Sequence, residues 1–138
     1  MQDRFALIVT AIICLTVTVA FAYTENQSTR GEQVFSVKCA KCHGNDGHGG
    51  QVPDGYDGYT GMKAPPVAGP GALPHMDTAQ NVYTFVKNHM PIQDPGSLGK
   101  EDTLDIVAFD LKANNIAQPD KKPLTFKDLP SIKIHGGS

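Results

Sequence analysis

Cys39-Ala40-Lys41-Cys42-His43 is the stretch of sequence that decides the fold. Two cysteines three residues apart on a turn of helix can each bond one vinyl-derived carbon of the same porphyrin. The histidine that follows can then point its imidazole at the iron. This C-x-x-C-H spacing is the signature of covalent haem attachment. It predicts one haem c held by Cys39 and Cys42, with His43 as an axial ligand of the iron.

Two other interpretations of the motif are weaker. A redox-active dithiol usually follows a strand, whereas a helix is expected directly before Cys39. A zinc site would need further cysteines or paired histidines at ligand spacing. The third cysteine of the chain, Cys14, lies in an apolar N-terminal run and is not available for such a site. We therefore favour haem over a dithiol or zinc.

The composition suits a small domain built around such a cofactor. The chain has 138 residues, no Trp, 14 glycines and 10 prolines. A domain of this size buries only a modest core unaided, and a haem can serve as the centre of that core. The net charge is −2, and the lysines are spread along the chain, so no signature of nucleic-acid binding is present.

The N-terminal run, residues 5–22, is apolar and carries no charge. As a helix it would reach about 27 Å, enough to enter or span the hydrocarbon core of a bilayer. Arg4 precedes it and Glu25 follows it, so the positive-inside rule exports the rest of the chain. We expect a retained single-pass anchor in the cell membrane, with the haem domain on the periplasmic side. The alternative is cleavage after Ala22, within an Ala-x-Ala site, which would release a soluble periplasmic protein.

A first helix is predicted immediately before the haem motif. Thr29 and Glu32 have the spacing of a capping box, so the helix is expected to begin there and to run into Cys39. Residues 44–61 contain seven glycines and residues 64–75 contain four prolines. Residues 44–61 are expected to form neither a helix nor a strand, and residues 64–75 are expected to stay extended or turned.

Two further helices are predicted after these loops. Asp77, with Gln80 at the capping-box position, is expected to begin the second helix. This helix ends before Pro91, because a proline disfavours helical backbone at the preceding residue. The third helix is predicted from about Lys100 to Asn114, with acidic residues in its first turn.

The expected fold is therefore all-α. Residues 25–117 would form a small helical domain around one covalent haem, with long Gly/Pro-rich loops. Residues 1–24 would form the apolar N-terminal helix, as an anchor or a signal peptide. Residues 118–138 show no clear periodicity and are expected to be a C-terminal extension.

The second axial ligand of the iron must come from a methionine or a histidine downstream of the motif. Met90 is favoured, because it ends a helix that can pack beside the haem and Pro91 then turns the chain outward. A thioether ligand raises the reduction potential relative to a second imidazole. His89 is the rival ligand, and a lone methionine is otherwise a filler of core space. The remaining candidates are Met62, Met76, His48 and His75.

With these motifs in place, the chain resembles the class I cytochromes c over roughly residues 29–115. Besides the attachment motif, the resemblance rests on Gly-rich residues 44–50, on residues 64–69, on Met90-Pro91 and on residues 95–98. It implies that the first and last helices cross near a small residue and aromatic side chains, a role that falls to Gly31, Phe35, Ile106 and Phe109.

The resemblance also implies a partner for the proximal histidine. A proline carbonyl in the loop after the motif accepts the ring N–H of that histidine in this family, which fixes the tautomer. Pro65 and Pro66 both fit the role for His43, and the sequence leaves the choice between them open.

The function implied is electron transfer and not enzymatic catalysis. A His/Met pair leaves no open position on the iron, so no small-molecule substrate is expected. The chain looks similar to the monohaem subunits of bacterial respiratory, photosynthetic or quinol-oxidising complexes. We therefore expect redox partner proteins in a multi-subunit membrane complex, with the C-terminal extension lying on another subunit. The alternative is a haem enzyme or gas sensor with an open or displaceable sixth ligand.

Overall fold

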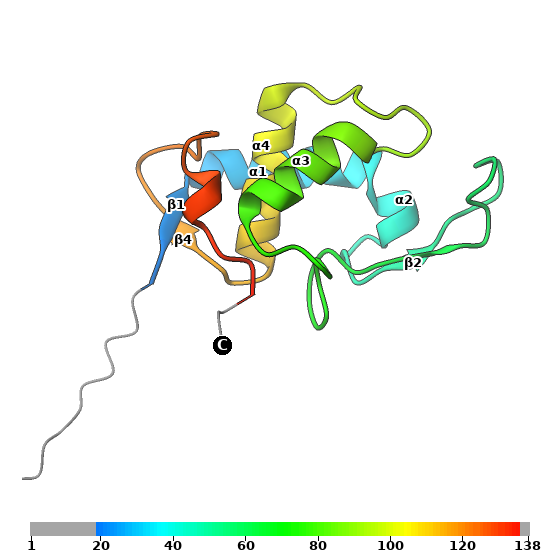
Figure 1. Ribbon diagram of the computed structural model, residues 1–138, viewed down its shortest axis with the longest axis horizontal. Helices are drawn as coiled ribbons and strands as arrows, with labels where there is room; N and C mark the ends of the chain where they lie inside the picture. Colours follow the sequence, from blue (N-terminus) through cyan, green and yellow to red (C-terminus); the bar gives the residue numbers. More distant parts are fainter. Residues whose placement is uncertain (1–18, 136–138) are drawn as a thin grey trace, which may run out of the picture.

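The computed structural model describes residues 19–135, which fold into four helices and four very short strands. The helices are α1 (Glu25–Lys38), α2 (Ala40–His43), α3 (Ala79–His89) and α4 (Lys100–Ala113). The strands are β1 (Phe21–Tyr23), β2 (Gly50–Gln51), β3 (Lys63–Ala64) and β4 (Gln118–Pro119), and a short 3-10 helix spans Leu129–Ser131. In Figure 1, β1 lies on the left of the domain and α2 on the right, with the loop between β2 and β3 reaching beyond α2. The fold is a small helical domain with long loops, as predicted.

The crossing of α1 and α4 is the centre of the fold. A Cβ on Gly31 would overlap the backbone carbonyl of Asp105 and lie 2.9 Å from Cβ of Phe109, so only glycine permits this approach. The rings of Phe35 and Phe109 lie beside the crossing, with centroids 5.0 Å apart. Ile106 is also buried there. The crossing residues expected from the family resemblance are thus confirmed.

The start of α1 differs from the prediction. The helix begins at Glu25, and its N-cap is Thr24, whose side-chain oxygen accepts a hydrogen bond from the backbone N of Gln27 at 3.2 Å. Thr29 lies inside the helix, so the capping box predicted there is wrong. The first turn is retained because Gln27 is buried against the C-terminal segment, a tertiary contact that a local pattern does not contain.

The other helices lie close to their predicted positions. The capping box of α3 is formed by Thr78 and Asn81, one residue later than predicted, because it is the Thr78 hydroxyl that meets the backbone N of Asn81 at 3.3 Å. This helix ends before Pro91, as expected. The bounds of α4 agree with the prediction to within one residue.

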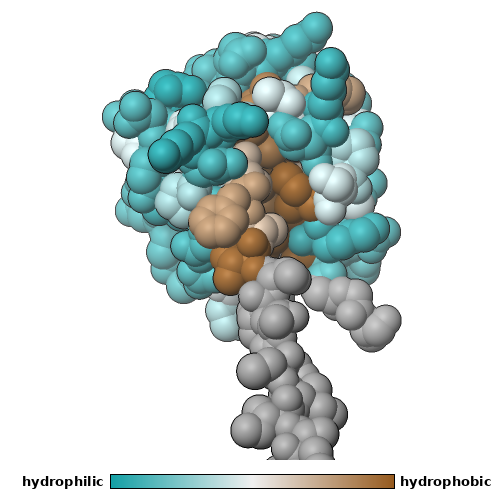
Figure 2. All heavy atoms as spheres, turned by 90° about the vertical axis from the view of Figure 1, so that its left-hand side faces the viewer, coloured by the Kyte–Doolittle hydropathy of each residue, from teal (hydrophilic) through white to brown (hydrophobic). Residues whose placement is uncertain are grey.

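The N-terminal strand β1 pairs in parallel with β4. It contains the last residues of the apolar run 5–22, so that run does not continue as a helix through Phe21. Residues 1–18, which hold most of the predicted anchor, lie outside the described residues. Within residues 19–135, no helix is both long enough and apolar enough to cross a bilayer. Figure 2 shows apolar side chains gathered at the end of the molecule that carries β1, where Phe21 is exposed.

The C-terminal segment packs on its own domain, at least as far as residue 135. Leu124, Leu129 and Ile134 are buried in the core. The Gln27 side chain holds both backbone groups of Leu124, since its Nε2 donates to the carbonyl at 3.0 Å and its Oε1 accepts from the N–H at 2.7 Å. Figure 1 shows this segment, in orange and red, beside β1 and the start of α3. The expected arm on another subunit is therefore wrong for this stretch, because its apolar side chains are used internally.

Candidate functional site

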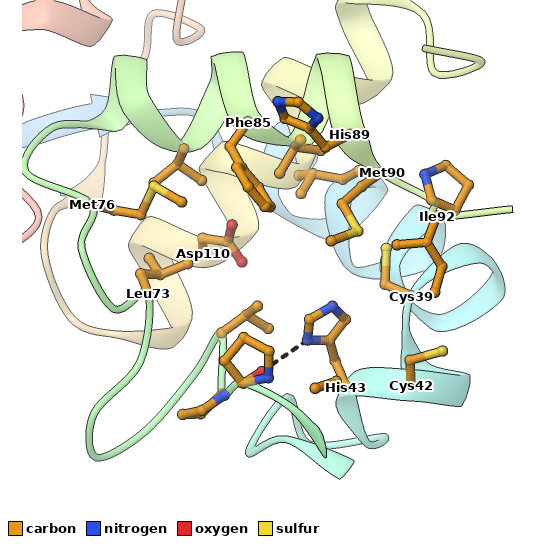
Figure 3. Close-up of a pocket in the computed structure, with 18 of the residues that line it drawn as sticks. Cys39, Cys42, His43, Leu73, Met76, Phe85, His89, Met90, Ile92 and Asp110 are labelled. Carbon is orange, nitrogen blue, oxygen red and sulfur yellow. Dashed lines mark hydrogen bonds between the residues drawn. The ribbon is translucent and has the colours of Figure 1, made fainter. Parts of the chain in front are cut away.

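A cavity of about 920 Å³ opens between the helices. This volume lies at the upper end of the range of about 300–1,000 Å³ that is typical for cofactor and small-molecule sites. Its walls come from α1, α2, α3 and α4 and from the segments that follow α2 and α3, and they are mainly apolar (Figure 3). A flat apolar cofactor with one polar edge would replace the core that the protein itself does not supply.

The attachment motif lies along one edge of this cavity. Cys39 ends α1, and the short helix α2 begins directly after it, so Cys42 and His43 turn toward the same space (Figure 3). The backbone N of His43 donates to the carbonyl of Cys39 at 3.0 Å, which holds the motif in a single turn. Both thiols are free and line the cavity. Burial raises the pKa of the Cys39 thiol to about 12, with smaller contributions from Asp110 and Cys42. A thiol with so high a pKa is a poor nucleophile for dithiol chemistry.

His43 has the hydrogen-bond partner that the family resemblance implied. Nδ1 of His43 lies 2.9 Å from the carbonyl oxygen of Pro65. A carbonyl can only accept, so Nδ1 carries the proton and Nε2 keeps its lone pair for a metal. Of the two prolines left open by the sequence, Pro65 makes this contact. The contact depends on Gly49, where a Cβ would lie 2.9 Å from the carbonyl oxygen of Ala64.

Met90 reaches the cavity from the wall opposite His43. It is the C-cap of α3, in extended backbone, and its N–H donates to the carbonyl of Val86 at 3.1 Å. Its thioether points into the cavity, whereas the ring of His89 turns away and packs beside Phe85, with centroids 5.0 Å apart (Figure 3). The helix end thus directs the methionine inward and the rival histidine outward.

The other candidate ligands are less well placed. Met62 is 54% exposed at the rim of the cavity, and Met76 lies on a side wall beside Leu73 (Figure 3). His48 is exposed and pairs with Asp46 at 3.2 Å. His75 is exposed as well. Cys39, Cys42, His43, Pro65 and Met90 are therefore brought together. Pro66 also lines the cavity, but its carbonyl accepts from the backbone N of Leu73 at 3.0 Å.

One cavity residue, Asp110, is not among the site residues predicted from the sequence. Asp110 projects from α4 into the cavity, is 3% exposed, and its Oδ1 has no hydrogen-bond partner within residues 19–135 (Figure 3). Burial raises the pKa of this carboxyl well above its ordinary value. A signal was present in the sequence, because a carboxylate between Phe109 and Leu111 interrupts the apolar face of α4.

Comparison with known proteins agrees with this geometry. The family described as cytochrome c oxidase, cbb3-type, subunit III matches residues 26–109, which is more than half of the chain. The fold is similar to the sulfane dehydrogenase SoxCD of Paracoccus pantotrophus, with a TM-score of 0.55 and 26% sequence identity. That similarity covers 96% of this chain and 66% of that chain.

The chain is also similar in sequence to three thiosulfate dehydrogenases. It is 30% identical to that of Stutzerimonas stutzeri over 83 residues, 31% identical to that of Psychrobacter arcticus over 88 residues, and 30% identical to that of Allochromatium vinosum over 85 residues. These matches cover 58%, 62% and 62% of this chain but only 25%, 25% and 31% of the relatives. The chain therefore spans between a quarter and a third of the length of the curated relatives it matches.

The family match runs from the first turn of α1, through the attachment motif, to the crossing residue Phe109 in α4. It thus includes the helix pair and the motif that build the cavity. The chain belongs to the cytochrome c family described as cytochrome c oxidase, cbb3-type, subunit III, and it is a class I c-type cytochrome.

Proposed function

We propose that this chain binds one haem c covalently through Cys39 and Cys42, with His43 and Met90 as the axial ligands, and transfers single electrons between partner proteins. The observation that carries the proposal is the convergence of these four side chains on one apolar cavity from opposite walls (Figure 3). A haem bound there supplies a one-electron couple between ferrous and ferric iron.

The protein's own residues would prepare the site for this task. Pro65 fixes the tautomer of His43 and orients its ring, so that Nε2 faces the cavity. The end of α3 presents the Met90 thioether, which favours the ferrous state relative to a second imidazole. With both positions taken, no site remains on the iron for a substrate. The chain would therefore act as an electron-transfer protein and not as an enzyme.

The partners would be other subunits or domains of a redox complex. The similar proteins are named as a sulfane dehydrogenase and as thiosulfate dehydrogenases, and the chain matches only part of each curated relative. We propose that this chain takes electrons from a partner that oxidises an inorganic sulfur compound, on the extracytoplasmic side of the membrane, and passes them toward a respiratory chain. Anchoring by the N-terminal apolar run, or its removal at Ala22, remains a prediction.

The ligand assignment is tested by absorption spectroscopy of the ferric holoprotein, produced with a haem-maturation system. A methionine sulfur on ferric haem gives a weak long-wavelength band. We expect this band in the wild type and in Met76→Ala and Met62→Ala, the matched cavity methionines, and we expect its loss in Met90→Ala. Retention of the band in Met90→Ala would contradict the assignment of Met90.

The choice between a carrier and an enzyme is tested separately. We expect the ferrous wild type to bind no carbon monoxide at neutral pH, whereas Met90→Ala should bind it. Thiosulfate alone should not be turned over by the purified chain. Rapid carbon monoxide binding by the wild type would support the alternative of a haem enzyme or gas sensor with a displaceable sixth ligand. Catalytic oxidation of thiosulfate by the chain alone would also contradict the carrier role.

A further inference from the structure

Asp110 is a buried carboxyl group that the fold does not use. It lies at the start of the last turn of α4, with its carboxyl directed into the cavity between the walls that carry His43 and Phe85 (Figure 3). Oδ1 has no hydrogen-bond partner within the described chain, although buried polar atoms in folded proteins are nearly always paired. An unpaired buried carboxyl of this kind calls for a functional explanation.

Asp105, a second buried carboxyl on the same helix, has a structural role and serves as a comparison. Asp105 is equally buried, at 3% exposure, but both of its oxygens are paired with the Arg30 guanidinium, at 2.8 and 3.0 Å. It faces the α1–α4 crossing and not the cavity. Asp110 has no such cation, so packing of the helices gives no reason for a carboxylate at this position.

The other titratable groups around the cavity are of a different kind. Besides Cys39, Cys42 and His43 of the attachment motif, they are five side chains that are exposed to solvent: Lys38, Tyr59, Lys63, His75 and His89. His43 is committed to Pro65 on one side and would be bound to iron on the other. Cys39 and Cys42 would no longer titrate once they are bonded to the haem. Among the cavity-lining residues that the structure describes, Asp110 therefore supplies the single buried carboxyl group.

We propose that Asp110 binds a proton when the haem iron is reduced and releases it when the iron is oxidised. This inference rests on the proposed function, because it needs a haem in the cavity. A ferric iron held in this cavity would add one positive charge to the space that the carboxyl faces, and at low dielectric constant an opposite charge favours the carboxylate. Reduction removes that charge, so burial again favours the neutral acid.

The proton and electron balance is simple. When one electron arrives from the redox partner, the Asp110 carboxylate takes one proton from solvent and forms one O–H bond. When the electron leaves to the acceptor, that bond breaks and the proton returns to solvent. No other bond of the protein changes. Electron transfer by this chain would therefore move one proton for each electron in the pH range where Asp110 titrates.

The experiment is a spectroelectrochemical titration of the full holoprotein at a series of pH values. For one electron, a tenfold change in an equilibrium constant corresponds to 59 mV. We expect the wild-type potential to fall by up to 59 mV per pH unit over a limited range. Asp110→Asn should lose this dependence and Asp110→Glu should restore it. The control Asp105→Asn removes a buried carboxylate of the same helix outside the cavity and should keep it.

Equal pH dependence in the wild type and Asp110→Asn would overturn the proposal, since the haem propionates or the exposed histidines would then be its source. A pH-independent wild-type potential would overturn it as well. The absence of any one-electron haem couple would instead overturn the proposed function, so the two failures are distinct.

A second measurement on the wild type covers the case in which Asp110→Asn does not fold. Infrared difference spectra between the two redox states should contain the C=O stretch of a protonated carboxylic acid that appears on reduction. Because the protonated acid is expected in only one redox state, a spectrum without this band would overturn the proposal without any variant.

Discussion

The two sides of α4 are completed in different ways. On the side that faces α1, Gly31 admits close backbone contact, Phe35 and Phe109 pack together, and Asp105 is paired with Arg30. On the side that faces the cavity, apolar side chains surround a space of about 920 Å³ and Asp110 lacks a partner. The first side is packed by protein side chains alone, whereas the second borders a space that a bound cofactor would fill.

The largest expected effect comes from removing the attachment residues. Cys39→Ala with Cys42→Ala should abolish covalent haem, detected by mass spectrometry of the intact chain. The thermal unfolding transition should also broaden or disappear, because no haem would then fill the cavity. Cys14→Ala, outside the motif, should retain one haem per chain. A cooperative transition of unchanged midpoint in the haem-free double variant would show that the cavity side is self-sufficient.

A second test changes the side of α4 that packs against α1. Gly31→Val forces side-chain atoms into the Asp105 carbonyl and the Phe109 side chain, so α1 and α4 must separate. Overpacking of this kind costs about 1–3 kcal/mol and at times more. The free energy of unfolding in urea should fall accordingly, while Gln33→Val, at an exposed position of the same helix, should change it little. Equal stability of the two variants would mean that the crossing is looser than described.

A third test concerns the C-terminal segment that covers the start of α1. Gln27→Ala leaves both backbone groups of Leu124 without their partners, and a buried unsatisfied group costs about 1–3 kcal/mol. We expect a loss of that size in urea unfolding and faster proteolysis of the C-terminal segment. Gln33→Ala is the matched control. If the two variants are cleaved at the same rate, the segment is not held by Gln27.

The smallest effect is expected from the pH dependence of stability in the ferrous protein. Because burial raises the pKa of Asp110, the folded state binds its proton more tightly than the unfolded state. The contribution of Asp110 to stability should therefore be largest at low pH and be lost as the pH rises from the ordinary aspartate value through the raised pKa. Asp110→Asn should lack this decline in urea titrations over the same pH range. A decline of equal size in the variant would assign it to other groups.

The sequence predicted the cavity side better than the edges of the fold. The motif at Cys39–His43, the position of Met90 before Pro91 and the bounds of α4 all follow from short-range chemistry. The N-cap of α1 does not, because Thr24 and Thr29 both precede plausible helical turns, and burial of Gln27 selects the first. The register of the α3 cap was likewise off by one residue.

Tertiary placement explains the remaining differences. Leu124, Leu129 and Ile134 are five residues apart, a spacing that matches neither a helix face nor a strand face. Their burial could not be read as a pattern, and the C-terminal segment was interpreted as an arm. The position of Asp110 is not predicted either: its carboxylate interrupts the apolar face of α4 in the sequence, but the sequence does not show which part of that face borders the cavity.

The parallel pairing of β1 with β4 also determines where the N-terminal end of the described chain lies relative to the attachment motif. This pairing places Phe21 on the side of the domain away from α2 (Figure 1). If the N-terminal run stays in a bilayer, the domain stands on its β1 end, and the attachment edge with Cys42 is held out toward the aqueous phase. Diffusing partners could then approach that edge without first having to displace the lipid surface.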